Sequence, residues 1–210
     1  MKKFRIYINF DKEEKWLEQM AEQGWQLKKQ NILYTFESAP PEKEKIKIDF
    51  RGFSKNSNYL DYLSLFEDSG WQHIAGSKNS GNQYFKRIDK NSDEDIFSDA
   101  VSRAGRYKRL SHFMLTIAII FIPLVIYSGI QGALGFDIFI NPRSLYLTPG
   151  LWDYSGFDFW RRFIFETPFA LMRGLSCSIS LLLISSYVVL TVKSLMVYRK
   201  AMNDSLKEKI

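Results

Sequence analysis

Two long stretches without charged residues constrain this chain more than any other feature. The first runs from Leu110 to Ile130, 21 residues with no Asp, Glu, Lys or Arg, and the second from Gly174 to Val192, 19 residues that include five serines. At the helical rise of about 1.5 Å per residue, the windows span roughly 31 and 28 Å, which matches the hydrocarbon thickness of a bilayer. Both windows therefore predict transmembrane helices. Pro123 inside the first is tolerable because neighbouring groups can satisfy the carbonyl that it frees.

Basic residues beside the windows predict the orientation. Residues 1–100 carry 16 basic and 17 acidic side chains, whereas residues 101–112 carry four basic and no acidic ones; Lys193, Arg199 and Lys200 follow the second window. Because positive charge is retained on the cytoplasmic side of a membrane, we expect a multi-pass protein of the cell membrane with both termini in the cytoplasm. A nearly neutral N-terminal domain lacks the basic face that nucleic-acid binding requires, so we expect no nucleic-acid partner.

The windows divide the chain into six segments. We expect a cytosolic domain at 1–90, a polar to basic linker at 91–109, spans at 110–130 and 174–192, an extracytoplasmic aromatic loop at 131–173 between them, and a basic cytosolic tail at 193–210. The aromatic residues of the loop suit the headgroup region. Three alternatives stay open for residues 157–172: a helix lying flat at the interface, a loop packed on the helix ends, or an extension of the second span.

The first 90 residues alternate between strand-like and helix-like patterns. Strands are expected at 4–10, 32–38, 45–51 and 82–88, with helices in KEEKWLEQMAEQGWQL and at about 57–70. Five residues recur at an offset of 46: Leu17, Met20, Gly24, Trp25 and Gln26 correspond to Leu63, Phe66, Gly70, Trp71 and Gln72. This duplication predicts an α+β fold, a ferredoxin-like βαββαβ sandwich in which both helices cover one face of a four-stranded antiparallel sheet.

The structural motif that we expect consists of Trp16 together with Gly24, Trp25, Gly70 and Trp71 of the repeated unit. The two glycines are placed as helix C-caps, and the tryptophan rings can close the core. A role of the tryptophans in stacking on a ligand is the alternative.

Several of these segments resemble one known family. FDKEEKWLEQMAEQGWQL, YTFE, IDFR, LFEDSGWQHI and QYFKR together resemble the bacterial membrane-protein family described as domain of unknown function 2812. The resemblance covers about residues 4–90, and the two apolar segments that follow fit the layout of the family. It implies a membrane protein without an established activity, found mostly in Gram-positive bacteria and often encoded beside a PadR-type transcription regulator. That context suggests an envelope-stress or other membrane-associated regulatory system.

No residue pattern predicts catalysis, a cofactor or a metal site. Neither histidine, His73 or His112, is accompanied by a nucleophile, and Cys177 is the single cysteine. Motifs that bind phosphate or catalytic zinc are absent from the sequence, and the pair Glu13–Glu14 is expected on the solvated face of a helix. We therefore expect a non-enzymatic protein without cofactors.

The sheet face that the helices leave open is the candidate surface for a partner. If Phe4, Ile6, Ile8 and Phe10 face the helices, the open face carries Arg5, Tyr7, Lys47, Asp49 and Arg51. These residues are mixed in charge and poor in aromatics, unlike the stacking face of an RNA-recognition module. Besides the lipid bilayer we therefore expect a protein partner, and self-association stays open.

Three functions compete for such a chain. The first is an anchored regulator or sensor whose cytosolic domain binds a protein, and the alternative is an accessory subunit of a membrane transporter or export complex. An enzyme acting on lipids would need an interfacial site among Arg161, Arg162 and Glu166.

Overall fold

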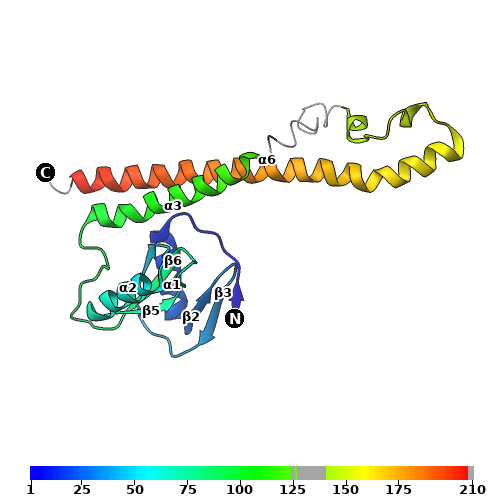
Figure 1. Ribbon diagram of the computed structural model, residues 1–210. Helices are drawn as coiled ribbons and strands as arrows, with labels where there is room; N and C mark the ends of the chain where they lie inside the picture. The colour runs from blue at the N-terminus through cyan, green and yellow to red at the C-terminus, as the bar shows by residue number, and fades with distance from the viewer. Residues whose placement is uncertain (124–125, 127–140, 208–210) are drawn as a thin grey trace. The chain divides into compact units, whose positions relative to one another are not determined.

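A computed structural model describes residues 1–123, 126 and 141–207 (Figure 1). It forms two compact units, Met1–His112 together with Leu190–Ile210, and Phe113–Val189. The first unit contains β1 (Lys2–Lys3), α1 (Phe10–Glu22), β2 (Trp25–Gln30), β3 (Tyr34–Ser38), β4 (Ile46–Phe50), α2 (Asn56–Asp68), β5 (Trp71–Ala75) and β6 (Asn82–Arg87). Helix α3 (Ala100–Ile120) follows, then two 3₁₀ turns, Pro142–Leu145 and Leu151–Asp153, and helix α6 (Gly156–Lys207).

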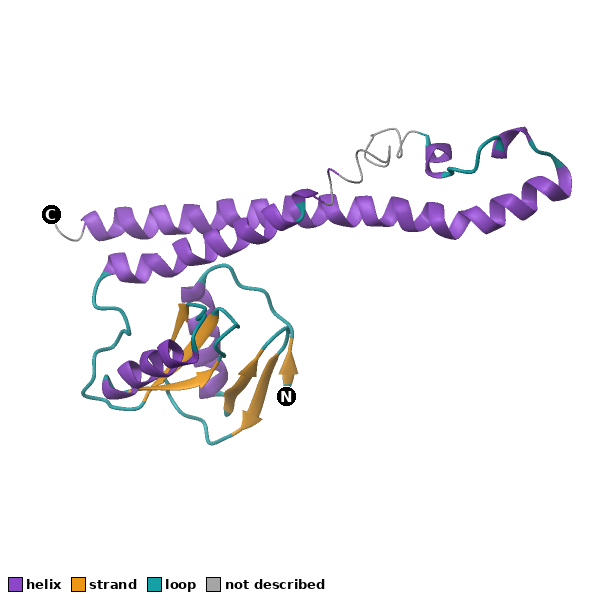
Figure 2. Ribbon diagram, viewed as in Figure 1, coloured by secondary structure: helices purple, strands orange, loops and turns teal. Residues whose placement is uncertain are grey.

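The N-terminal domain is α+β and consists of two copies of one strand–helix–strand–strand unit (Figure 2). The strand orders are β1-β3-β2 and β4-β6-β5, so that each three-stranded sheet has its third strand in the centre, and every pairing is antiparallel. The two sheets contact each other through β2 and β5, and α1 packs against β2 of its own sheet and β4 of the other. The duplication inferred from the sequence is thus a duplication of topology.

The predicted ferredoxin-like sandwich is wrong, because the domain has two small sheets where one four-stranded sheet was expected. The expected strand at 4–10 does not form: only Lys2 and Lys3 pair, and Asn9 ends the extended segment by capping α1. The Asn9 side chain accepts a hydrogen bond from the backbone N–H of Lys12 at 3.1 Å, which satisfies a free donor of the first helical turn. Two strands that the sequence analysis did not assign, β2 and β5, pair with β3 and β6 instead.

The apolar face expected for that first strand is also not buried. Phe10 is buried in the first turn of α1, but the side chains of Phe4 and Ile6 are 62% and 76% exposed. A strand that pairs over only two residues gives these side chains no sheet to lie on.

The repeated glycines end the two helices as expected. Gly24 and Gly70 directly follow the C-cap residues of α1 and α2 and have φ angles of +82° and +80°. A Cβ atom at Gly70 would lie 2.8 Å from the Cβ of Ser92, so both the backbone angle and the space require glycine there. The following tryptophans open β2 and β5, and Trp71 is buried in a cluster with Tyr62, Phe66 and Phe85.

Trp16 has a structural role in the first half of the domain. Its ring packs edge-on against Tyr34 and Phe36 of β3, with centroids 4.9 and 5.6 Å away, and stacks on Tyr7. Trp25 is half-buried at the start of β2. The contacts of Trp16 and Trp71 are with core side chains, which fits the structural interpretation of the motif.

Helix α6 is continuous over the second apolar window and the residues before it. Residues 157–172 therefore belong to the same helix as 174–192. Within the described residues, one helix is long and apolar enough to cross a membrane, the stretch Gly156–Asn203. The predicted first span begins in α3, and its positions 124–125 and 127–130 lie outside the described residues.

Candidate functional site

The first turns of α3 carry the basic residues that the sequence analysis assigned to membrane orientation. In the structure, three of these side chains form ion pairs within the N-terminal unit: Arg103 with Asp95, Arg106 with Asp11 and Glu14, and Arg109 with Asp49. Arg106 and Arg109 lie three residues apart and so share one face of the helix. We call Arg106 and Arg109, with Asp11, Glu14 and Asp49, the arginine latch.

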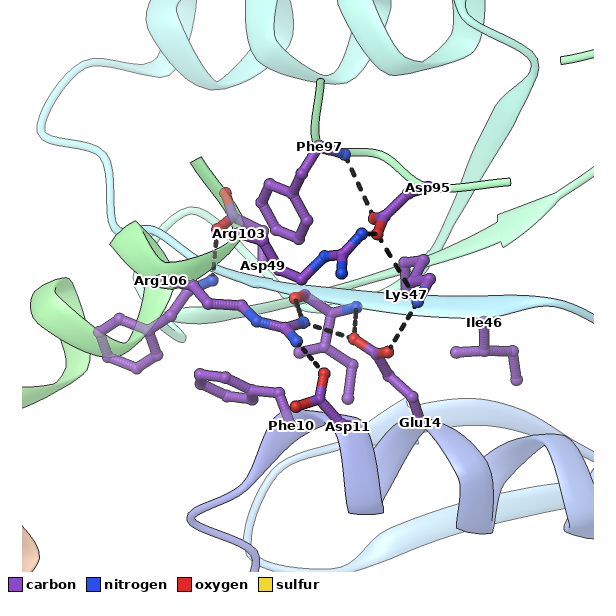
Figure 3. Close-up of polar contacts among 12 residues, drawn as sticks. Phe10, Asp11, Glu14, Ile46, Lys47, Asp49, Asp95, Phe97, Arg103 and Arg106 are labelled. Atoms are coloured by element: carbon purple, nitrogen blue, oxygen red, sulfur yellow. Dashed lines mark hydrogen bonds and ion pairs between the residues drawn. The ribbon is translucent and has the colours of Figure 1, made fainter. Parts of the chain in front are cut away.

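Arg106 is the centre of the latch (Figure 3). Its side chain is 1% exposed. One terminal nitrogen, Nη1, donates to Glu14 Oε1 at 2.5 Å and to the carbonyl oxygen of Ile48 at 2.7 Å; the other, Nη2, donates to Asp11 Oδ1 at 2.6 Å. Arg106 thereby joins α3 to both α1 and β4.

Aromatic rings enclose the guanidinium of Arg106. It lies 5.1 to 5.3 Å from the ring centroids of Phe10, Phe97 and Tyr107, close enough for cation–π attraction. Burial alone would lower the pKa of Arg106, but the neighbouring charges of Glu14 and Asp11 raise it overall. The latch therefore holds a permanent positive charge, balanced by carboxylates, inside the domain.

The second arginine extends the latch along β4. Arg109 Nε donates to the carbonyl oxygen of Phe50 at 2.6 Å, and Nη2 donates to Asp49 Oδ1 at 2.5 Å. Asp49 is 3% exposed and also accepts a hydrogen bond from the hydroxyl of Tyr62 at 3.0 Å. Burial raises the pKa of Tyr62, so this hydroxyl stays protonated and able to donate.

Side chains occupy the outer edge of β4, the edge that faces away from β6. The N–H groups of Ile46 and Ile48 donate to Glu18 and Glu14 at 3.2 and 3.1 Å, and that of Phe50 donates to Asp49 at 2.8 Å. The carbonyl oxygens of Ile48 and Phe50 accept from the two arginines. An open strand edge is a template for another strand, and here α1 and α3 fill it with side chains.

Helix α3 is also held through Tyr107, which lies between the two arginines in sequence. The Tyr107 hydroxyl accepts a hydrogen bond from the backbone N–H of Phe10 at 3.0 Å and donates to Asp11 at 3.2 Å. Its backbone carbonyl accepts from the hydroxyl of Ser194, a fully buried residue in the last part of α6. Within the first unit, Tyr107 thus connects α3 both to the start of α1 and to the last part of α6.

A second buried carboxylate joins the two sheets. Glu13 is 1% exposed, and its Oε1 accepts hydrogen bonds from the hydroxyls of Tyr34 on β3 and Tyr84 on β6, both at 2.7 Å. Burial raises the pKa of Glu13 even though the two hydroxyls lower it. The solvated face expected for Glu13 and Glu14 is wrong, because both side chains are buried: Glu13 joins the sheets, and Glu14 belongs to the latch.

The five residues expected on an open sheet face do not lie on one face. Arg5 and Tyr7 follow β1 outside any strand, and Arg5 donates to the Tyr7 hydroxyl at 2.9 Å while lying over the ring of Trp16. Asp49 belongs to the latch, and Lys47 lies next to it, with Lys47 Nζ 3.1 Å from Glu14 Oε2. Arg51, just past β4, lies over the ring of Tyr62. The predicted surface depended on the single sheet that the structure lacks.

The described side chains offer no clear chemical constellation. His73 Nε2 lies 3.0 Å from the side-chain oxygen of Gln83, and burial lowers the pKa of its ring. Among the residues described, no group of three or more His, Cys, Asp or Glu side chains could hold a metal ion. What the arrangement can do is mechanical: it joins a helix to a domain through ion pairs whose central arginine, Arg106, is buried.

Comparison with known proteins adds one finding. A family model described as "Protein of unknown function (DUF2812)" matches residues 9–119, a range that includes the latch and most of α3. No curated protein and no solved structure matches the chain.

Proposed function

Since the chain belongs to the DUF2812 family, whose description names no activity, we propose its function from the arginine latch. The protein is a membrane-anchored, non-enzymatic regulator or sensor. Its membrane segment acts on the α+β domain through α3, and the domain responds by binding or releasing a protein partner.

The observation that carries this proposal is the burial of Arg106 between α1 and β4. A surface ion pair would hold α3 weakly, at about 0–1 kcal/mol. A buried arginine with three acceptors is different, because removing one partner leaves an uncompensated charge and typically costs about 3–5 kcal/mol. Such a contact favours two discrete states, docked and undocked, which is what a switch requires.

The edge of β4 is the element that undocking would change. In the docked state, Arg106 and Arg109 occupy the carbonyl oxygens of Ile48 and Phe50. Withdrawal of α3 would free these two acceptors, whereas the N–H groups of Ile46 and Ile48 would stay bonded to Glu18 and Glu14 of α1. An extended segment of a partner could then bind by adding a strand if it also displaced these two carboxylates. The latch would then act as a cover over a protein-binding edge.

The membrane arrangement is part of the proposal. Helix α6 supplies one candidate span, and the apolar window that begins in α3 supplies a second. Two spans place the domain and the C-terminal tail on the same side, and the basic residues that flank the windows favour the cytoplasm. A movement of either span would reach the latch, since α3 carries the arginines and the last part of α6 carries Ser194.

Cross-linking in living cells tests the regulator. A photo-cross-linking residue at the exposed position Lys45, directly before β4, would report what lies at the edge. The double substitution Arg106→Met and Arg109→Met should increase cross-links to a partner protein several-fold. Arg103→Gln is the matched control, because Arg103 lies on the same helix with its side chain 47% exposed. Equal cross-linking in all three proteins would show that the latch does not control this edge.

The exposed apolar surface of α6 favours a second candidate, an accessory subunit of a membrane transporter or export complex. Leu171, Leu175 and Leu182 are 58%, 58% and 68% exposed, and helices of another membrane protein would suit them as well as lipid does. Removal of residues 1–95 distinguishes the two. The accessory subunit should still copurify with its complex, whereas the regulator should lose its partner.

A further inference from the structure

A pocket of about 380 Å³ in the Phe113–Val189 unit is lined by Thr148, Arg161, Arg162 and Phe165. The two arginines are adjacent in the second turn of α6, and Thr148 belongs to the segment that precedes this helix. Neither arginine takes part in the latch. This pocket belongs to the unit that holds most of the candidate span.

Glu166, which accepts a hydrogen bond from the pocket residue Thr148, already has other partners. Glu166 forms an ion pair with Arg173 and accepts hydrogen bonds from the hydroxyl of Thr148 at 2.7 Å and the backbone N–H of Leu147 at 3.2 Å. Among the described residues, Arg161 and Arg162 form no ion pair with Glu166, Asp153 or Asp158. The pocket therefore presents two guanidinium groups whose charge the described carboxylates leave unbalanced.

Arg162 lies against an aromatic ring. Its guanidinium lies 4.2 Å from the centroid of the Tyr154 ring, close enough for cation–π attraction. Its Nε is buried without a hydrogen-bond partner within the structure described. This Nε is shielded from solvent, so a ligand in the pocket would bind through the terminal nitrogens of the two guanidinium groups.

The chemistry of the pocket indicates the class of that ligand. A guanidinium offers a fork of N–H donors that matches carboxylate and phosphate oxygens, and two such groups side by side suit the charge and the several oxygens of a phosphate. An apolar side chain is exposed there as well: Phe165 lines the pocket at 70% exposure, and Ile164 and Phe157 of the same helix are 64% and 81% exposed. A phosphate attached to acyl chains satisfies both features, whereas a free phosphate uses only the first.

We propose that Arg161 and Arg162 form a binding site for the phosphate of an anionic phospholipid headgroup, with Phe165 beside the first part of its acyl chains. The site would fix the beginning of α6 at the membrane–water interface, where aromatic and arginine side chains are favoured. It is independent of the latch and of the partner that the domain binds.

Native mass spectrometry of the full-length protein, released from detergent micelles with defined lipid, tests the proposal. The wild-type chain should retain phosphatidylglycerol over phosphatidylcholine, and the double variant Arg161→Gln and Arg162→Gln should retain phosphatidylglycerol on the order of tenfold less. Arg199→Gln is the matched control, because it removes an exposed arginine near the other end of α6. That control should bind lipid as the wild type does.

Three results would overturn the proposal: equal retention of the two lipids by the wild type, undiminished phosphatidylglycerol binding by the double variant, or complete displacement of the lipid by inorganic phosphate at similar concentration. The last result would assign the pocket to a free phosphate. If the double variant does not fold, Arg161→Gln alone serves, since Arg161 is exposed and its loss should weaken binding several-fold while helicity is unchanged.

Discussion

Replacement of Arg106 by methionine tests the latch most sharply, because methionine keeps an apolar stem of similar length and removes the charge together with the N–H donors. The guanidinium leaves behind Glu14, whose side chain is 4% exposed, and the Ile48 carbonyl that loses its donor. Asp11 is different, since its side chain is 53% exposed and can return to water. The lost stability should therefore come almost entirely from the buried Glu14 carboxylate and the Ile48 carbonyl.

The expected magnitude follows from what still surrounds Glu14. Removing one partner of a buried ion pair costs about 3–5 kcal/mol. Lys47 stays 3.1 Å from Glu14 and the N–H of Ile48 still donates to it, so the lower end of that range, about 3 kcal/mol, is expected. Arg106→Met with Glu14→Gln should recover about 1–2 kcal/mol of this, because the second change removes the stranded charge.

Hydrogen exchange of the full-length chain in mild detergent measures the loss of stability at β4 and in the first part of α3. Peptides covering β4 and residues 100–109 should exchange roughly a hundredfold faster in Arg106→Met, which is the rate equivalent of about 3 kcal/mol. Arg103→Gln should change the free energy of opening measured by these peptides by less than about 1 kcal/mol, because the ion pair of Arg103 with Asp95 is close to solvent. If Arg106→Met lost less than about 1 kcal/mol of stability by this measurement, or if both variants lost the same amount, the latch would not hold α3 as described.

Two further predictions concern the domain itself. Burial raises the pKa of Glu13 above its ordinary 4.5, so the folded state keeps a proton that the unfolded chain has lost. The free energy of unfolding should therefore fall as the pH rises through the folded-state pKa of Glu13. Urea unfolding between about pH 4 and pH 8 measures this fall, and Glu13→Gln should lack the part of it that Glu13 causes. Gly70→Ala should destabilise the domain by at least about 1–2 kcal/mol in thermal unfolding, because φ is +80° and the new Cβ meets Ser92, whereas Gly52→Ala, with nothing within 4 Å, should be nearly neutral.

Much of the domain follows from local sequence signals. The expected strands at 32–38, 45–51 and 82–88 contain β3, β4 and β6, and the repeated Gly-Trp pairs mark the ends of α1 and α2. These signals are local: alternation over a few residues, and a glycine at the one position that needs a positive φ.

The topology depends on contacts that local signals do not contain. WQLKKQ and WQHIA are short and mixed in polarity, so they read as the ends of helices, but each pairs with the strand that follows it along the chain. Once β2 and β5 exist, each half of the domain completes its own three-stranded sheet. The single sheet of a ferredoxin-like fold is then excluded.

The latch was hidden for the same reason. Arg106 bonds to Asp11 and Glu14, which lie 95 and 92 residues away in the chain. Membrane topology is a sufficient explanation for a cluster of basic residues before an apolar window. The sequence therefore offered no reason to expect that these residues also form buried ion pairs. The spacing of Arg106 and Arg109, which places both on one helical face, was the available signal.

The distance between α3 and the domain in a lipid membrane is the most direct test of the account. Spin labels at Lys108 and Ser57, both exposed, can be introduced after replacement of Cys177 by serine and measured by pulsed electron resonance in nanodiscs. With the latch intact, a single narrow distance distribution is expected, and Arg106→Met with Arg109→Met should broaden it or shift it to longer distances. A broad distribution in the wild type, or an unchanged narrow one in the double variant, would contradict the claim that the arginine latch fixes α3 to the domain.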